Sequence, residues 1–195
     1  MKILFLYNND CALELLNSIK DLGHETVAYS ERLTVDFIKE GEFDLAVSYT
    51  YRYILTDELI NAFNGNVVNI HNAYLPYNRG ADPNLWSLVE GTPRGVTLHY
   101  ISAGLDMGDI IAQRLVTEGD GKTLKSSYDN LDKNAKEMFL EAFKDYDKWN
   151  ELRHAQSGSG TYHSLKDGEK IKSVITSYDM KIADFLKALK DRKIV

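Results

Sequence analysis

Short apolar runs alternate with amphipathic stretches along the first 71 residues of the chain. The apolar runs lie at residues 2–7, 24–29, 43–49 and 67–71. The stretches between them repeat apolar residues at intervals of three and four, which is typical of helices that bury one face. The pattern therefore predicts an α/β fold, in which a mostly parallel central sheet is flanked by helices in a Rossmann-like arrangement.

Polar residues mark where the helices in this half should begin, and glycines mark where they should end. We expect Asp10 to cap a helix that stops at Gly23, and Thr56 to cap a later helix. A short helix between these two is expected over residues 32–39, closed by Gly41. A capping oxygen accepts a hydrogen bond from the first turn, whereas glycine adopts the conformations that end a helix.

The pattern continues beyond residue 71 with strands and two further helices. Asp82 is expected to cap a helix over residues 83–89, and strands are expected over residues 95–101 and 109–116. The first of these strands alternates apolar and polar residues, so Val96, Leu98 and Tyr100 are expected on one face and Thr97 and His99 on the other. Apolar spacings of three and four then predict one long helix over residues 123–149.

The last part of the chain is short and begins with a Gly- and Ser-rich stretch. Residues 156–161 are predicted to be a flexible connector, and Asp179 is expected to cap a final helix. The part after the connector is too small to form a core of its own. We therefore expect one main domain over residues 1–150, with a short appendage at residues 151–195 packed on it.

Composition and charge narrow the class of protein. The 195 residues carry a formal net charge of −6, which does not favour a nucleic-acid partner. Cys11 is the only cysteine, so an intrachain disulfide is impossible and a reducing compartment is expected. No apolar run has the length of a membrane span or the form of a signal peptide. These features predict a cytoplasmic protein with no membrane partner.

The turn after the first strand argues against the common nucleotide cofactors. It reads Asn8-Asn9-Asp10 and lacks the glycines that let a pyrophosphate approach the backbone. The chain also lacks a Walker-type phosphate loop. Neither NAD nor ATP is therefore indicated as a cofactor.

Two polar residues, Asn69 and His71, lie near the end of a predicted buried strand and point to the same side of it. Burying such groups costs free energy unless they are hydrogen-bonded or take part in function. Ligands of parallel sheets bind at the carboxyl ends of strands, which is where both residues are expected. Asp106, in a tight loop between two glycines, is a third candidate. Taken singly, the three have structural alternatives: a turn asparagine, a core histidine and an Asx-turn aspartate.

The histidines do not suggest a metal site. His71, His99, His154 and His163 are scattered along the chain, and no cysteine motif accompanies them. We therefore expect the site to work without a metal ion.

Several short motifs follow one another between residues 66 and 116. They are Asn69-Ile70-His71, Leu75-Pro76, Arg79-Gly80-Ala81, Gly95-Val96-Thr97-Leu98-His99 and Gly104-Leu105-Asp106-Met107-Gly108-Asp109-Ile110. Together they resemble the formyltransferase family that uses 10-formyltetrahydrofolate as formyl donor. The series is far more specific than any one motif, and the predicted topology fits this family from residue 1 to about residue 150.

The resemblance implies that Asn69, His71 and Asp106 are catalytic. In such a reaction a primary amine attacks the formyl carbon, and negative charge develops on the formyl oxygen. The Asn69 amide and a protonated His71 are suitable donors to that oxygen. Asp106 can favour the imidazolium of His71 and accept the proton that the amine loses, directly or through a water molecule.

The resemblance also implies how the folate is held. In the family, backbone groups of two loops bind the pterin end, and the matching pieces here contain Tyr53, Leu55 and Ala103. For Tyr53 and Leu55 the alternative is simple packing ahead of a helix. The peptide bond between Leu75 and Pro76 is hypothesised to be cis, because a cis bond would fix the loop beside the candidate strand.

The acceptor is expected to be a small-molecule amine. The stretch 71–86 looks most like the sugar-nucleotide N-formyltransferases, which implies an amino sugar on a nucleoside diphosphate. Tyr77, Asn78 and Arg79 are the candidate acceptor-binding residues, although Arg79 could equally be a solvated loop cation. The alternatives are a 10-formyltetrahydrofolate hydrolase, a glycinamide-ribonucleotide-type transferase and a folate-binding module without activity. A homodimer is left open.

Overall fold

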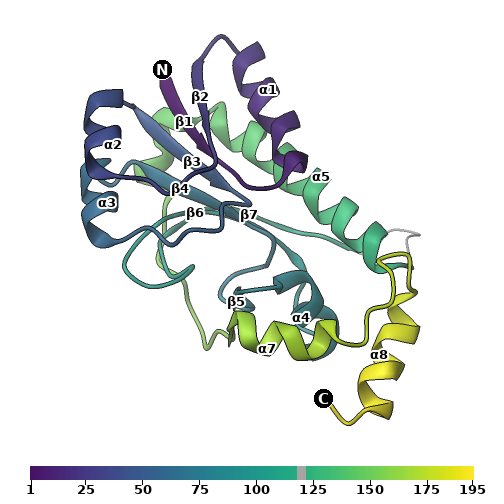
Figure 1. The fold of residues 1–195 in the computed structure, drawn as a ribbon. Coiled ribbons are helices and arrows are strands. Elements are labelled where there is room, and N and C mark those ends of the chain that lie inside the picture. The colour runs from purple at the N-terminus through teal and green to yellow at the C-terminus, as the bar shows by residue number, and fades with distance from the viewer. Residues whose placement is uncertain (118–121) are drawn as a thin grey trace. The chain divides into compact units, whose positions relative to one another are not determined.

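The computed structural model of the protein describes residues 1–117 and 122–195 (Figure 1). These residues form two compact units, each built from three separate segments. The first unit contains residues 1–71, 98–112 and 139–156, and the second contains residues 72–97, 113–138 and 157–195. The predicted boundary at residue 150 does not coincide with this division, so the description as 1–150 and 151–195 stays a prediction.

The central sheet of the described residues has six strands in the order β2-β1-β3-β4-β6-β7. Their bounds are β1 Lys2–Leu6, β2 Glu25–Tyr29, β3 Leu45–Tyr49, β4 Val67–His71, β6 Gly95–Tyr100 and β7 Ile110–Leu115. Strands β1 to β4 pair in parallel. The predicted α/β fold with a mostly parallel sheet is therefore confirmed.

Helices cover both faces of the strands in the first unit. They are α1 Leu13–Asp21, α2 Val35–Gly41 and α3 Asp57–Ala62. Figure 1 shows α2 and α3 on one side of these strands and α1 on the other. On the side of α2, Leu4 and Leu6 of β1 pack in one cluster with Ile38 and Phe63. The intervening residues of β1 are fully buried as well, so the strand is apolar on both faces, as a parallel interior strand should be.

The capping residues differ in part from those predicted. Asn9, rather than Asp10, accepts the capping hydrogen bond of the first 3-10 turn, η1 Asp10–Ala12, which leads into α1. Thr34 caps α2, which therefore begins three residues later than predicted. Thr56 caps α3 as predicted. Asn9, Thr34 and Thr56 act as caps because each has an extended backbone immediately before the first turn. In that conformation the side-chain oxygen can accept a hydrogen bond from an N–H of the turn.

The second unit has its own apolar core and its own helices, α4 Pro83–Glu90, α7 Leu165–Lys172 and α8 Ile182–Asp191. Its buried residues include Leu85, Ile171, Phe185 and Leu189. A short parallel ladder, β5 Arg79–Gly80 with β8 Tyr162–His163, belongs to the same unit and is too short to show in the sequence pattern.

Two predicted caps in the second unit are wrong. Asp82 stands at the N-cap of α4 with φ 52°, but its carboxylate makes no capping hydrogen bond. That carboxylate lies 2.8 Å from the Lys172 ammonium instead. Lys181, and not Asp179, is the residue that precedes α8. An ion pair in a partly buried place outcompetes a local cap for the Asp82 carboxylate.

The long helix predicted over residues 123–149 ends earlier. Helix α5 spans Leu124–Phe143, and the chain then turns through η2 Tyr146–Lys148 into α6 Trp149–Leu152. The turn brings Trp149 back onto Phe143, with ring centroids 6.0 Å apart, and its indole N–H donates to the Ala142 carbonyl at 2.9 Å. The apolar spacing in the sequence continues past the end of α5 because the residues that fold back after it, such as Trp149, pack against the buried face of the same helix.

Strand β6 forms where an alternating strand was predicted, and its polar residues are buried. Thr97 and His99 are 0% and 1% exposed, so the polar positions are as buried as the apolar ones. Hydrogen bonds make this burial tolerable, because the Thr97 hydroxyl donates to the Ala73 carbonyl at 2.7 Å and accepts from the Leu75 N–H. The following peptide bond, between Leu75 and Pro76, is cis, as hypothesised.

The predicted flexible connector is tied down at both ends. In the first unit, the Gln156 side chain donates hydrogen bonds to backbone carbonyls. In the second unit, the Thr161 hydroxyl accepts from the Asn78 N–H at 2.8 Å. Of the helices in the described parts of the chain, none combines the length and apolarity needed to cross a membrane.

The aromatic cluster at the end of α5 generates a stability prediction. Phe139 is fully buried and stacks on Phe143 with ring centroids 5.3 Å apart. Phe139→Ala should lower the free energy of unfolding by about 3–5 kcal/mol, because it removes apolar burial and leaves a cavity. Urea denaturation measures this change. Leu152→Ala, at an exposed position, is the control and should cost no more than about 0.5 kcal/mol. Equal losses of unfolding free energy in the two variants would contradict the assignment of Phe139 to the buried core.

Candidate active site

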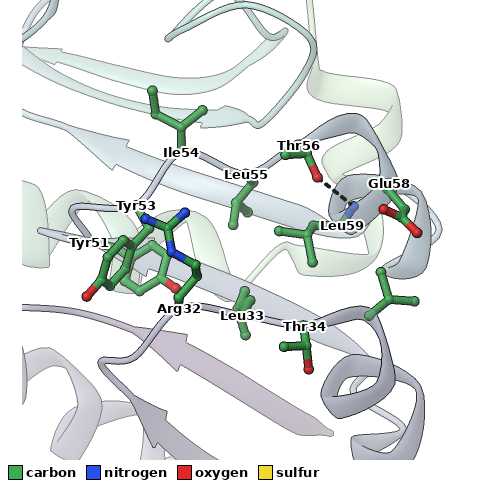
Figure 2. A pocket seen from close by; sticks show the side chains of 11 residues that line it. Arg32, Leu33, Thr34, Tyr51, Tyr53, Ile54, Leu55, Thr56, Glu58 and Leu59 are labelled. Carbon is green, nitrogen blue, oxygen red and sulfur yellow. Dashed lines mark hydrogen bonds between the residues drawn. The ribbon is translucent and has the colours of Figure 1, made fainter.

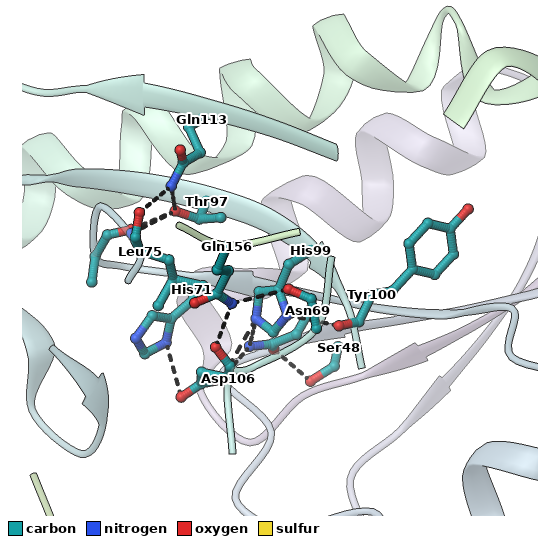
Figure 3. A network of polar contacts seen from close by, with 12 residues as sticks. Ser48, Asn69, His71, Leu75, Thr97, His99, Tyr100, Asp106, Gln113 and Gln156 are labelled. Atoms are coloured by element: carbon teal, nitrogen blue, oxygen red, sulfur yellow. Dashed lines mark hydrogen bonds and ion pairs between the residues drawn. The ribbon is translucent and has the colours of Figure 1, made fainter. Parts of the chain in front are cut away.

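Polar side chains from two strands and one loop meet at the carboxyl edge of the sheet in the first unit (Figure 3). Asn69 and His71 lie at the end of β4, and His99 lies near the end of β6. Asp106 comes from the loop that follows β6. His71 is 7% exposed and His99 is 1% exposed, so the cluster is held largely away from water.

The sheet register places Ser48 beside Asn69. The two residues are partners in the parallel ladder of β3 and β4, so their side chains leave the sheet on the same side. The Ser48 hydroxyl donates to Asn69 Oδ1 at 2.9 Å. This hydrogen bond identifies the oxygen of the amide and turns its NH2 group towards Asp106.

The Asp106 carboxylate is the centre of the cluster. Its side chain is 9% exposed, with Oδ2 3.7 Å from His71 Nδ1 and Oδ1 3.6 Å from His99 Nε2. Asn69 Nδ2 donates to Oδ1 at 3.4 Å. The structure thus brings together the three residues that the sequence singled out, and adds a second histidine.

His99 is a part of the cluster that the sequence analysis missed. Its Nδ1 lies 2.8 Å from the Tyr100 carbonyl, which can only accept, so this nitrogen carries a proton. In the neutral ring Nε2 is then an acceptor, and it lies 3.3 Å from Asn69 Nδ2, which can only donate. His99 and Ser48 therefore fix the Asn69 amide from opposite ends. In the sequence, His99 stood out only as a polar position of an alternating strand and as the last residue of the motif Gly95-Val96-Thr97-Leu98-His99.

The loop that carries Asp106 has little freedom. Asp106 adopts the left-handed conformation with φ 54°, which aspartate tolerates better than most residues. At Gly108 a Cβ atom would lie 1.8 Å from the Tyr100 carbonyl oxygen, so only glycine fits there. Gln156, also missed in the sequence, donates to the carbonyls of Asp106 and Gly108.

The loop after β3 is shaped by residues that follow β1. Thr50 has φ 65°, which is unusual for a β-branched residue, and its hydroxyl accepts from the N–H of Asn9 at 3.1 Å. The Asn8 side chain accepts from the Arg52 N–H at 2.9 Å and donates to the Ser30 carbonyl at 2.7 Å. These hydrogen bonds hold the segment after β1 and the segment after β3 together at the carboxyl edge of the sheet.

Tyr53 and Leu55, predicted to contact a folate, line a hollow of about 250 Å³ in the first unit (Figure 2). The Arg32 guanidinium lies 4.9 Å from the centroid of the Tyr53 ring. Burial raises the pKa of the neighbouring Tyr51 to about 12, so that phenol stays protonated at neutral pH. Leu55 is buried in the apolar core, which leaves its backbone for any contact with a ligand.

Ala103 stands on the other predicted folate loop. It is exposed, in the same loop as Asp106, and two apolar neighbours are exposed beside it, Leu105 at 39% and Met107 at 55%. Exposed apolar side chains next to a buried carboxylate suit the flat face of an aromatic ligand. The contacts predicted for the two loops stay predictions.

The candidate acceptor residues belong to the second unit. Asn78 is 0% exposed, its side chain donates to the Thr92 hydroxyl at 2.7 Å, and its backbone N–H donates to Thr161. Its polar atoms therefore hold the loop together internally. Tyr77 and Arg79 are half-buried, and the Arg79 N–H donates to the Thr161 carbonyl at 3.0 Å in the ladder of β5 and β8. Acceptor binding by these residues stays a prediction.

Within residues 1–117 and 122–195, no three His, Cys, Asp or Glu side chains are arranged to hold a metal ion.

Comparison with known proteins gives matches in both sequence and structure. The methionyl-tRNA formyltransferase of Listeria monocytogenes serotype 4a (strain HCC23) is 33% identical over 106 residues, which are 54% of this chain and 34% of that protein. The chain thus spans about a third of the length of this curated relative.

Two solved structures match nearly the whole chain. The formyltransferase PseJ from Anoxybacillus kamchatkensis, in complex with UDP-4,6-dideoxy-4-formamido-L-AltNAc and tetrahydrofolate, is 36% identical, with a TM-score of 0.80 over 96% of this chain and 100% of that chain. A 4-N formyltransferase from Francisella tularensis is 23% identical, with a TM-score of 0.77 over 96% and 87% of the two chains. The second match speaks for the fold alone.

The family model described as formyl transferase matches residues 9–143, which include the whole cluster around Asp106 except Gln156. This match covers well over half of the chain. The chain therefore belongs to the formyl transferase family.

Proposed function

We propose that the protein transfers the formyl group of 10-formyltetrahydrofolate to a primary amine on a sugar that is carried by a nucleoside diphosphate. The observation that carries this proposal is the meeting of Asn69, His71 and Asp106 at one buried point of the first unit. The match to PseJ, whose complex contains tetrahydrofolate and a UDP-linked formamido sugar, supports both the donor and the acceptor class.

The first step needs donors at the formyl oxygen. When the amine attacks the formyl carbon, the carbonyl electron pair moves onto oxygen and must be stabilised there. The Asn69 amide is suited to this, because Ser48 occupies its oxygen and its NH2 group has two hydrogens. One hydrogen serves Asp106 and His99, and the other is assigned to the oxyanion.

His71 supplies the second donor. Its Nδ1 lies 3.7 Å from Asp106 Oδ2, so in the protonated ring the hydrogen on Nδ1 is directed at the carboxylate. The hydrogen on the opposite nitrogen, Nε2, is then assigned to the developing oxyanion. The same carboxylate thereby orients the ring and supports its charge.

Asp106 completes the proton transfers. The attacking amine becomes positively charged when its lone pair forms the new C–N bond, and it must lose a proton before the intermediate collapses. The Asp106 carboxylate accepts this proton directly or through a water molecule. Breaking the bond from the formyl carbon to the folate nitrogen then releases tetrahydrofolate, whose nitrogen takes the proton that Asp106 accepted.

The similar proteins suggest two classes of acceptor, an amino sugar on a nucleoside diphosphate and a tRNA. Methionyl-tRNA formyltransferases share about a third of their length with this chain, which makes tRNA the competing acceptor. The net charge of −6 argues for the small-molecule acceptor instead. A cytoplasmic location fits this proposal, and a homodimer is left to measurement.

The acceptor is tested by following tetrahydrofolate release from 10-formyltetrahydrofolate with the purified protein. The panel contains UDP-linked 4-amino sugars, glycinamide ribonucleotide and initiator methionyl-tRNA. Release that requires an amino-sugar nucleotide, with a formamido product in the mass spectrum, is the expected result. Release without any acceptor would favour a hydrolase, and release that depends on tRNA would overturn the proposed acceptor.

Single substitutions in the trio should each remove most of the activity. Asn69→Ala, His71→Ala and Asp106→Ala are expected to lower kcat by about a hundredfold or more, because each removes a donor or a proton acceptor from the transition state. Steady-state kinetics measures the loss, and circular dichroism checks that the fold is retained. Nearly full turnover in Asp106→Ala would show that its role in proton transfer is wrong.

Ser48→Ala should slow the reaction without removing a catalytic group. The Asn69 amide would lose the hydrogen bond that fixes its orientation, so kcat should fall by about tenfold. Ser18→Ala is the matched control, since the Ser18 hydroxyl also donates to one acceptor in the first unit but lies on α1. An equal effect of the two substitutions on kcat would contradict the orienting role of Ser48.

A further inference from the structure

The segment after α6 lies along the loop that carries Asp106. The backbone of His154 forms two hydrogen bonds with Ile110, at 2.8 and 3.0 Å, in an antiparallel bridge. The Arg153 side chain lies 3.6 Å from the Asp109 carboxylate and 5.3 Å from the centre of the Tyr100 ring. Residues 153–156, which we call the strap, are therefore fastened to the loop by backbone and side-chain contacts within the first unit.

Gln156 is the residue of the strap that reaches Asp106. Its Nε2 donates to the Asp106 carbonyl at 2.7 Å and to the Gly108 carbonyl at 2.9 Å, which uses both hydrogens of the amide (Figure 3). Among residues 151–160, Gln156 alone is not exposed to solvent. One side chain thus holds the peptide group that follows Asp106 and the peptide group that follows Gly108.

The place of the Asp106 carboxylate depends on these two peptide groups. Asp106 has φ 54°, a conformation that its surroundings must maintain. Its oxygens lie 3.4 to 3.7 Å from Asn69, His71 and His99, at the outer limit of direct interaction. A displacement of about 1 Å would break these contacts, and errors of this size in a catalytic group cost about a hundredfold in rate.

We propose that Gln156 is a positioning residue for formyl transfer, which holds the Asp106 carboxylate in register with Asn69 and His71 by clamping the carbonyls of Asp106 and Gly108. The inference rests on the proposed role of Asp106. Gln156 acts through the loop and is not assigned a contact with the substrates.

Gln156→Glu and Gln156→Ala test the clamp, with Asn130→Asp as the matched control. The Asn130 amide also donates to a backbone carbonyl, that of Thr117, and no role in the reaction is assigned to it. Gln156→Glu replaces two donors by a carboxylate that repels both carbonyls. It should lower kcat by about tenfold or more, with KM for 10-formyltetrahydrofolate changed less than about threefold and the control changed less than about twofold.

The pH profile distinguishes a clamp from a general structural role. Above its pKa the carboxylate introduced by Gln156→Glu has no hydrogen to donate, whereas below its pKa it has one O–H. The ratio of variant to wild-type kcat should therefore rise as pH falls from about 8 to about 5. For Gln156→Ala, which has no such group, the ratio should stay flat.

Hydrogen exchange tests the clamp separately from the proposed function. The Tyr100 amide donates to the Asp109 carbonyl and the Ile110 amide donates to the His154 carbonyl, so both report whether the loop stays in place. In Gln156→Ala these two amides should exchange about tenfold faster, even in a protein that shows no formyl transfer with any acceptor. The control variant should leave both rates unchanged.

Faster exchange with a lowered kcat and the rising pH ratio would support the clamp. Unchanged exchange, or faster exchange with full kcat, would overturn it. Loss of kcat equal to that in Asn130→Asp would also overturn it. A wild-type protein without formyl transfer would contradict the proposed function and leave exchange to decide whether Gln156 holds the loop.

Discussion

The buried carboxylate of Asp106 is the interaction on which the candidate site depends. A charge that is almost removed from water costs free energy unless opposite charge or hydrogen-bond donors surround it. Here the Asn69 amide donates a hydrogen bond to the carboxylate and the His71 ring faces it, and both residues belong to β4. The same groups that make the carboxylate tolerable are those that a formyl transfer needs. The arrangement that stabilises the buried carboxylate in the first unit is therefore also the arrangement that the proposed reaction requires.

The register of the parallel sheet brings some of these polar groups together. Because Ser48 and Asn69 are ladder partners on adjacent strands, a hydroxyl stands beside the amide without any loop having to carry it. Rigid strands hold Asn69, His71 and His99, while Asp106 comes from a loop. That loop is restrained by the close approach of Gly108 to Tyr100 and by the strap that ends at Gln156. The one residue of the trio that a loop carries is thus held by contacts from two other segments of the first unit.

The sequence predicted the sheet, its parallel strands and the pair Asn69 and His71, because apolar runs and side-chain alternation are local signals. It did not predict His99 or Gln156. A histidine among apolar residues reads as a strand position, and a glutamine before a Gly- and Ser-rich stretch reads as a linker. Their roles arise from contacts between segments far apart in the chain, 50 residues apart for Gln156 and Asp106. The cap expected from Asp82 failed for the same reason, since Lys172 lies 90 residues away and forms the stronger contact.

A double-substitution cycle of His71 and Asp106 tests most directly whether one carboxylate organises the site. kcat/KM is measured for His71→Ala, Asp106→Ala and the double variant with the acceptor that supports turnover. If the two residues act as a unit, the double variant should lose no more than about tenfold beyond the poorer single variant. If the two losses multiply, each residue works independently of the other, and the account of a shared charge is contradicted.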